Sequence, residues 1–216
     1  MSSSLIPIAT IGAGRWGSLH ARKLARLPGV VMHQIVDSNI ARARALAATI
    51  PGARAVASVD DLSASVQAVT VATPARTLAR VAGACLDRGL HVLCEKPLAT
   101  SSGEARQLLG LAHARGRRLH VGMVERFNPR LQGWPHFDHH LALYRWGPAR
   151  CAPCGLGLDW AIHDLDLARW LARTDLRVLS AEGGGDTLLV ELATVDGRTV
   201  TVDVRSGAKR HRREAR

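Results

Sequence analysis

The 216-residue chain could hold one large domain or two small ones, and its 47% apolar content is ample for a core. Of its formal charge of +11, almost half lies in residues 205–216, where the lack of interleaved aromatic residues favours a solvated tail over a nucleic-acid-binding one. No apolar run is long enough to span a membrane, the N-terminus lacks a signal-peptide pattern, and four cysteines are too few for a disulfide scaffold. We therefore expect a cytoplasmic protein that binds neither membrane nor nucleic acid. The remaining positive charge would suit a phosphorylated substrate such as a nucleotide sugar.

The first 37 residues predict a strand, a glycine-rich turn, a helix and a second strand. Residues 5–11 form an apolar run typical of a buried parallel strand, and residues 12–17, GAGRWG, match G-x-G-x-x-G. Such glycines allow a tight turn, close approach of the backbone to a pyrophosphate, and close packing of helix on strand. The helix that begins here would direct its unpaired N–H groups toward an anion. We predict a dinucleotide site formed by Gly12, Gly14, Arg15, Trp16 and Gly17.

Asp37 ends the second apolar run and lies twenty positions after Gly17. A carboxylate at this position can accept hydrogen bonds from both hydroxyls of an adenosine ribose and would repel a 2′-phosphate. This favours NAD over NADP as the cofactor, although Ser38 and Arg42 lie near enough in the sequence to tolerate a phosphate.

Helices and strands continue to alternate up to residue 124. Asn39 is a suitable N-cap, and Ser101 with Glu104 has the spacing of a capping box. The expected strands cover residues 53–57, 66–72, 91–94 and 119–124, and the expected helices cover residues 40–49, 60–62, 75–88 and 104–115. The pattern predicts an α/β fold, a Rossmann doubly wound parallel sheet, which we assign to residues 1–123.

The pattern changes from residue 125. Residues 132–157 are rich in Pro, Gly and His and predict an irregular stretch, whereas residues 159–171 predict a helix. Strands are expected at residues 177–182, 187–195 and 199–205, the last two joined by an Asp-Gly hairpin turn. We interpret residues 124–204 as a partial α+β domain with an antiparallel sheet and residues 205–216 as a basic tail. Cys151 and Cys154 form a C-x-x-C without a second such pair, so we interpret them as incidental and expect no metal site.

Two groups of residues could perform chemistry. Lys96 follows an expected strand at the edge where ligands bind in open parallel sheets, so it could stabilise alkoxide character on a substrate or form only a surface salt bridge. Glu95 could orient this lysine or touch the cofactor. His163 could accept a hydroxyl proton, and Asp159, one helical turn earlier, could hold its tautomer; a packed helical histidine is the alternative. Asp166 shares their helical face, but nothing else in the chain completes a metal site.

Taken together, the motifs resemble the glucose-fructose oxidoreductase/inositol dehydrogenase/MocA family. The resemblance rests on GAGRWG, ATP at residues 72–74, CEKPL at 94–98, VGMVERFNP at 121–129 and DWAIHDLDLARWL at 159–171. It implies an NAD(P)-binding Rossmann domain, a second domain for substrate and oligomerisation, and Lys96 and His163 as a catalytic pair assisted by Asp159. From the same motifs we expect cofactor contacts from Thr73, Pro74 and Glu95, and substrate contacts from Arg126 and Asn128.

The VGMVERFNP motif, with D-x-A-I-H-D-x-D later in the chain, looks most like the UDP-N-acetylglucosamine 3-dehydrogenase branch, which oxidises a sugar hydroxyl to a ketone. We therefore expect an NAD-dependent oxidoreductase that takes hydride from a secondary hydroxyl of a sugar or nucleotide sugar. The resemblance also implies a homo-oligomer assembled through the sheet of the second domain.

The chain departs from the family pattern in three places. Leu78 stands where members often carry histidine, the segment 129–159 is short and lacks the usual glycine-rich turn, and the sequence after about residue 205 is unlike the family. A second domain of only three strands would expose a sheet edge and an apolar face. The alternative function is therefore a non-catalytic or decayed dinucleotide-binding protein with an incomplete substrate domain.

Overall fold

The computed structural model describes residues 5–131, 133–134, 137–148, 155–208 and 210–216. It divides into two compact units, Met1–Gly122 and Met123–Arg216, and each unit is described by itself. Cys151 and Cys154 lie outside the described residues. Among the helices in the described ranges, none has the length and apolar character needed to cross a membrane.

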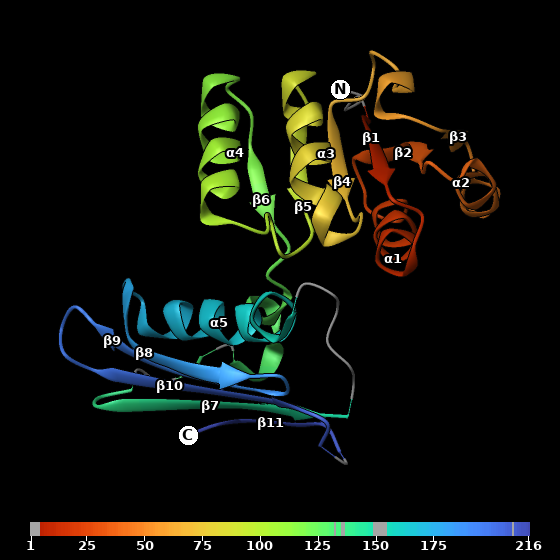
Figure 1. The fold of residues 1–216 in the computed structure, drawn as a ribbon. Coiled ribbons are helices and arrows are strands. Elements are labelled where there is room, and N and C mark those ends of the chain that lie inside the picture. The colour runs from red at the N-terminus through yellow and green to blue at the C-terminus, as the bar shows by residue number, and fades with distance from the viewer. Residues whose placement is uncertain (1–4, 132, 135–136, 149–154, 209) are drawn as a thin grey trace. The chain divides into compact units, whose positions relative to one another are not determined.

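The first unit contains a six-stranded parallel sheet in the order β3-β2-β1-β4-β5-β6 (Figure 1). Its strands are β1 (Ile6–Ile11), β2 (Val30–Val36), β3 (Arg54–Val56), β4 (Ala68–Val71), β5 (His91–Cys94) and β6 (Leu119–Val121). The order reverses between β1 and β4, which makes the carboxyl end of these strands the place for a ligand. The predicted α/β fold with a doubly wound sheet is confirmed.

Helices cover both faces of this sheet. They are α1 (Arg15–Leu24), α2 (Ile40–Ala47), α3 (Ala75–Asp87) and α4 (Ser102–Ala114), with a short 3₁₀ turn at Val59–Asp61. One apolar core joins the sheet to α1 and α2, and a second joins it to α3 and α4. The predicted N-caps are present: the side chains of Asn39 and Ser101 accept hydrogen bonds from the N–H groups of Arg42 and Glu104, at 3.3 and 3.2 Å.

The second unit is a five-stranded sheet in the order β11-β7-β10-β9-β8, with α5 (Ile162–Ala172) packed on one face (Figure 1). Its strands are β7 (His140–Gly147), β8 (Leu176–Gly184), β9 (Thr187–Thr194), β10 (Thr199–Ser206) and β11 (Arg212–Ala215). Two 3₁₀ turns, η2 (Val124–Phe127) and η3 (Pro129–Leu131), precede β7, and a π-helical turn, η4 (Gly157–Ala161), precedes α5. Because β7 pairs with β10 in parallel, the sheet is mixed and not wholly antiparallel.

Two expectations for this unit are wrong. The expected irregular stretch contains β7, whose side chains alternate between the core, where Leu141 and Leu143 lie, and the opposite face. The expected solvated tail contains β11, which pairs antiparallel with the other edge of β7. The physical reason is that β7 offers an unpaired edge, which an extended segment can complete whatever its charge. The arginine side chains of β11 nevertheless remain exposed.

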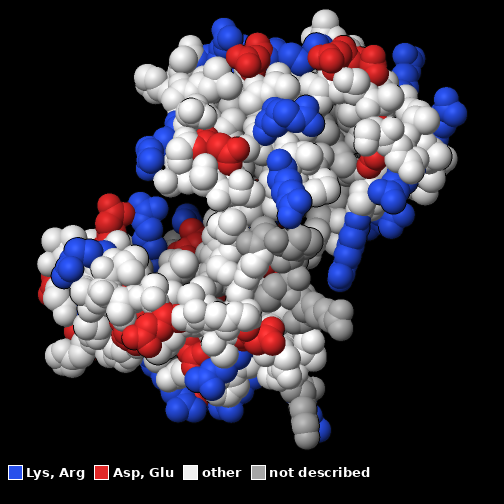
Figure 2. Space-filling view, viewed as in Figure 1, with Lys and Arg blue, Asp and Glu red and all other residues white. Residues whose placement is uncertain are grey.

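Charged side chains of both signs occur together on the face in view in Figure 2. In Figure 2, Lys and Arg are interspersed with Asp and Glu over both units. All three arginines in β10 and β11 also have carboxylate partners: Arg205 pairs with Asp203, Arg212 with Glu214 and Arg213 with Glu125.

Candidate functional site

The glycine-rich turn requires glycine at its first and last positions. Gly12 has a φ of 95°, and a Cβ at this residue would lie 2.5 Å from the carbonyl oxygen of Ala72 at the end of the neighbouring β4. A Cβ at Gly17 would lie 1.6 Å from the carbonyl oxygen of Gly12. Because glycine has no Cβ at either position, the start of α1 can pack closely against the end of β1, as the motif predicts.

Gly14 has a different environment. It is the exposed N-cap residue of α1, and no protein atom lies within 4 Å of where its Cβ would stand. The first turn of α1 carries no acidic residue, so the positive end of the helix dipole is not neutralised there. Arg15 and Trp16 are exposed beside it, with the guanidinium of Arg15 5.6 Å from the indole ring. The turn therefore leaves room for the backbone to approach an anionic ligand such as a pyrophosphate.

Asp37 connects this turn to the end of β2. Its carboxylate accepts hydrogen bonds from the backbone N–H of Ala13 at 2.7 Å and from that of Asn39 at 2.8 Å. The residue is half-buried, and it holds the turn at the edge of the sheet where a ribose would bind. Sequence reasoning placed the carboxylate near this edge but did not foresee its contact with Ala13.

Thr73 and Pro74 follow β4 on the same edge of the sheet. The hydroxyl oxygen of Thr73 is buried and has no hydrogen-bond partner among the described residues, which suits a polar group of a ligand. Pro74 is the N-cap residue of α3. Leu78, at the position where the family often has histidine, is 1% exposed and packs in the core below α3. In this chain the side chain at that position supports the fold.

Glu95 is the centre of a hydrogen-bonded group at the end of β5. Its Oε1 lies 2.9 Å from Nε2 of His20 on α1, and its Oε2 accepts a hydrogen bond from the backbone N–H of Lys96 at 3.2 Å. Burial raises the pKa of Glu95, but the hydrogen bonds and charges of His20 and Lys96 outweigh this and hold the pKa below its ordinary value. Glu95 thus remains a carboxylate that orients the backbone of Lys96, which leads into a cis peptide bond to Pro97. Sequence reasoning missed His20.

We expect His20→Ala to raise the pKa of Glu95. Burial raises the pKa of Glu95, and the hydrogen bond and charge of the His20 imidazole are the main effects that lower it. Without the imidazole, the effect of burial would no longer be offset. Because the pKa of Glu95 is lowered in the folded protein, its charge contributes stability above the ordinary pKa, and this contribution is lost as pH falls through the lowered value. The carboxyl ¹³C shift of Glu95 followed through an acid titration measures this pKa directly. An unchanged midpoint in the variant would contradict the role assigned to His20.

Cys94 lies next to this group but cannot act as a thiolate at neutral pH. Burial raises the pKa of Cys94, and also that of Cys85 on α3, to about 12. Both thiols are free and buried in the core of the first unit. Nucleophilic cysteine chemistry at these two positions is therefore excluded near neutrality.

In the second unit, Asp159 and His163 lie on either side of a change in helix geometry. Asp159 belongs to the π-helical turn η4, and His163 to the first turn of α5; both are half-buried. π-Helical turns inside helices are frequent at functional sites. Lys96, by contrast, belongs to the first unit.

Two ion pairs anchor the part of α5 that directly follows this histidine. The guanidinium of Arg126 from η2 binds Asp166 in a bidentate manner, at 2.8 and 2.5 Å. The guanidinium of Arg145 from β7 binds Asp164 in the same manner, at 2.5 and 2.8 Å, and lies 3.5 Å from Glu125. Asn128, expected to contact substrate, accepts a hydrogen bond from the backbone N–H of Arg130.

The Arg145 pair is buried, because the side chains of both Arg145 and Asp164 are 7% exposed. Burial lowers the pKa of Arg145, but the two carboxylates outweigh this effect and raise the pKa, so the guanidinium remains charged. On the other side of the network, Arg213 from β11 binds Glu125. The segment expected to be a solvated tail therefore contributes to the charge network beneath α5.

Comparison with known proteins agrees with this geometry. Residues 6–123 match the sequence model of the Gfo/Idh/MocA oxidoreductase family with its NAD-binding Rossmann fold. The chain belongs to the Gfo/Idh/MocA family. Its glycine-rich turn, the E-K-P segment after β5 and the carboxyl edge of the six-stranded sheet all lie within the matched residues or at their edge.

Individual Gfo/Idh/MocA proteins give the same result. The chain is 31% identical to inositol 2-dehydrogenase 4 from Saccharopolyspora erythraea, over 96% of this chain and 66% of that protein. It is 35% identical to UDP-N-acetylglucosamine 3-dehydrogenase from Acidithiobacillus ferrooxidans, over 73% of this chain and 51% of that protein. The solved structure of GenD2 from gentamicin A biosynthesis, in complex with NAD, is 28% identical with a TM-score of 0.84, covering 98% of this chain and 68% of that one. The chain spans about half to two thirds of the length of the curated relatives it matches.

Proposed function

We propose that this protein is an NAD-dependent dehydrogenase that oxidises a secondary hydroxyl of a sugar or nucleotide sugar. The observation that carries the proposal is the open space at Gly14, beside the start of α1 and on the edge of the sheet where Asp37, Thr73 and Glu95 follow β2, β4 and β5. The relatives named as inositol and UDP-N-acetylglucosamine dehydrogenases support the reaction class. The free thiols of Cys85 and Cys94 are consistent with action in the cytoplasm.

Each candidate site residue has its own proposed role in the reaction. Bound NAD supplies the hydride acceptor. His163 accepts the proton of the substrate hydroxyl, because imidazole titrates near neutrality, and Asp159 holds its orientation. The ammonium of Lys96 donates a hydrogen bond to a substrate oxygen and stabilises its alkoxide character, while Glu95 keeps the Lys96 backbone in place. Arg126 and Asn128 contact the substrate.

The variant Gly14→Ala tests the cofactor site without disturbing the fold. Its Cβ meets no protein atom, and its φ of −73° suits alanine, so the thermal midpoint should remain near that of the wild type. NAD affinity should fall about tenfold or more, because the methyl group occupies the space needed by the pyrophosphate. Gly110→Ala on α4, also in open space, is the matched control and should leave NAD affinity unchanged. Equal NAD affinity in both variants would place the cofactor elsewhere.

The preference for NAD is tested at Asp37. Removing its carboxylate by Asp37→Ser should lower the ratio of NAD to NADP affinity, because the repulsion of a 2′-phosphate is lost. The absolute NAD affinity should also fall, since the hydrogen bond to Ala13 is lost with the carboxylate. Titration of both nucleotides by calorimetry gives the ratio. A wild type that binds NADP more tightly than NAD would refute the preference.

The activity itself is tested by NADH formation on a panel of inositols, free sugars and UDP-sugars. Turnover with any of them supports the dehydrogenase. NAD binding without turnover on the whole panel would favour the alternative, a non-catalytic dinucleotide-binding protein. Failure to bind either NAD or NADH would refute both.

We also propose that copies of the chain associate through the face of the five-stranded sheet opposite α5. Arg145 points to α5, so its neighbours Tyr144 and Trp146 lie on the opposite face. There Arg205 and Arg212 stack on Trp146 at 5.4 and 5.3 Å, and aromatic and arginine side chains are enriched at protein interfaces. Light scattering after size exclusion, with Trp146→Ser as the variant, measures the association.

A further inference from the structure

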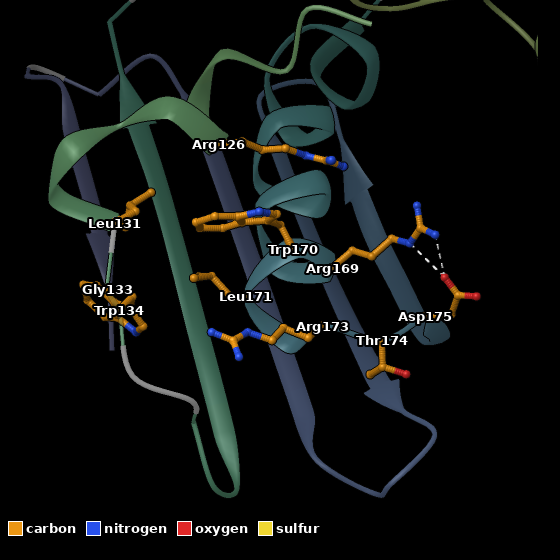
Figure 3. Close-up of a pocket in the computed structure, with 10 residues that line it drawn as sticks. All are labelled: Arg126, Leu131, Gly133, Trp134, Arg169, Trp170, Leu171, Arg173, Thr174 and Asp175. Carbon is orange, nitrogen blue, oxygen red and sulfur yellow. Dashed lines mark hydrogen bonds and ion pairs between the residues drawn. The ribbon is translucent and has the colours of Figure 1, made fainter. Parts of the chain in front are cut away.

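A cavity of about 930 Å³ lies beside α5 in the second unit. Its lining combines aromatic side chains with arginines: Arg126, Leu131, Gly133, Trp134, Arg169, Trp170, Leu171, Arg173, Thr174 and Asp175. In Figure 3, Trp170, Leu171 and Arg173 extend from α5 toward the segment that carries Leu131 and Trp134, whereas Arg169 points the other way, toward Asp175. The cavity therefore has two indole rings and a guanidinium directed into one space.

The arginines of this cavity differ in their partners. Arg126 is bound to Asp166, and Arg169 is bound to Asp175 at 2.8 Å. Arg173 has no ion pair with any described residue, and it is the one described non-glycine residue with a positive φ, 55°, at the C-cap of α5. An arginine is unfavourable in this left-handed conformation, which glycine adopts freely, and such strained residues cluster at ligand clamps. Arg173 is thus a charged group available to an anionic ligand.

Two residues that line the cavity, Trp170 and Arg173, share a helical face with the candidate base by their spacing. His163, Asp166, Trp170 and Arg173 are spaced i, i+3, i+7 and i+10, so they form one stripe along the helix. At about 1.5 Å per residue the stripe extends roughly 15 Å from His163 to Arg173. A ligand of several linked groups can therefore place a hydroxyl at one end and an anionic part at the other.

We propose that this cavity binds the phosphate-bearing nucleoside part of a nucleotide-linked sugar. Guanidinium groups bind phosphate oxygens through paired N–H donors, and bases stack on indole rings. In this arrangement Arg173 binds the phosphate and Trp170 with Trp134 forms the surface for the ring. The inference rests on the proposed dehydrogenase, whose substrate class it narrows to nucleotide sugars over free inositols.

The test is calorimetric titration of UDP into the full chain saturated with NAD, so that the cofactor site is already filled. We expect the wild type to bind UDP and Arg173→Gly to bind it at least about tenfold more weakly. Glycine relieves the left-handed backbone, so the thermal midpoint of this variant should equal or exceed that of the wild type, and misfolding cannot explain the loss. Arg177→Ala, which removes an exposed arginine of β8, is the control and should bind UDP normally. Trp170→Leu should also weaken UDP binding.

Two results would overturn the proposal: a wild type that does not bind UDP, or an Arg173→Gly variant that binds it as tightly as the wild type. The second is the result expected if Arg173 serves only to end the helix. The proposed dehydrogenase activity is tested independently of this site. Oxidation of free inositols without UDP binding would refute this site alone, and Arg173-dependent UDP binding without oxidation of any sugar would refute the dehydrogenase alone.

Discussion

His163→Ala and Lys96→Ala are each expected to lower turnover by about 100-fold to 10,000-fold while leaving NAD binding unchanged. The magnitude is that of a positioned proton-transfer group, and the affinity is preserved because neither side chain belongs to the glycine-rich turn. Steady-state NADH formation and a separate NAD titration measure the two effects.

Matched variants separate this effect from a general loss of charge or imidazole. Lys23→Ala and His113→Ala remove exposed residues of α1 and α4, and both should retain wild-type turnover. Normal turnover in both His163→Ala and Lys96→Ala would refute the assignment of the catalytic pair. A loss in only one of them would restrict the catalytic role to that residue.

Arg145→Met is expected to destabilise the second unit by about 3 to 5 kcal/mol. Removing one partner of a buried pair leaves the carboxylates of Asp164 and Glu125 buried with less compensation, which costs far more than the pair contributes by itself. Because Asp164 is adjacent to His163, the same loss should loosen the start of α5. Urea unfolding followed by tryptophan fluorescence measures the effect, since four of the five tryptophans belong to this unit.

The control for this prediction is Arg169→Ala, which breaks an ion pair whose side chains are 61% and 79% exposed. It should change stability by no more than about 1 kcal/mol. The double variant Arg145→Met/Asp164→Leu should recover part of the loss, because it removes both charges of the pair. A single Arg145→Met variant as stable as Arg169→Ala would contradict the role of the buried network.

Much of the first unit could be predicted because its signals are local. Strand β5 has the predicted bounds to the residue, since it is a mostly apolar run between clear breaks. The contacts that organise the candidate site were not predictable in the same way. His20 and Glu95 are far apart in the chain, and no pattern in either segment indicates that they meet.

In the second unit, by contrast, two of the strands could not be predicted from local signals. Strand β7 was missed because its alternation begins in a histidine-rich stretch and includes Arg145 at an inward position, where an apolar residue would signal a strand. Strand β11 was missed because its composition, rich in arginine, is that of a solvated segment. Strand β7 is held by pairing with β10, and β11 is held by pairing with β7. Neither pairing can be seen in the sequence of one segment alone.

The alternation of helices and strands, the glycine-rich turn and the family can all be predicted from the amino-acid sequence alone. These follow from periodicity and from backbone conformations that only certain residues adopt. Three features are visible only in the folded protein: the basic end of the chain completes a sheet, Arg145 joins Glu125 and Asp164 below α5, and Arg173 extends into a cavity beside Trp170. The reason is physical: edge pairing, buried charge pairs and cavities arise between segments distant in the chain, so no local pattern specifies them.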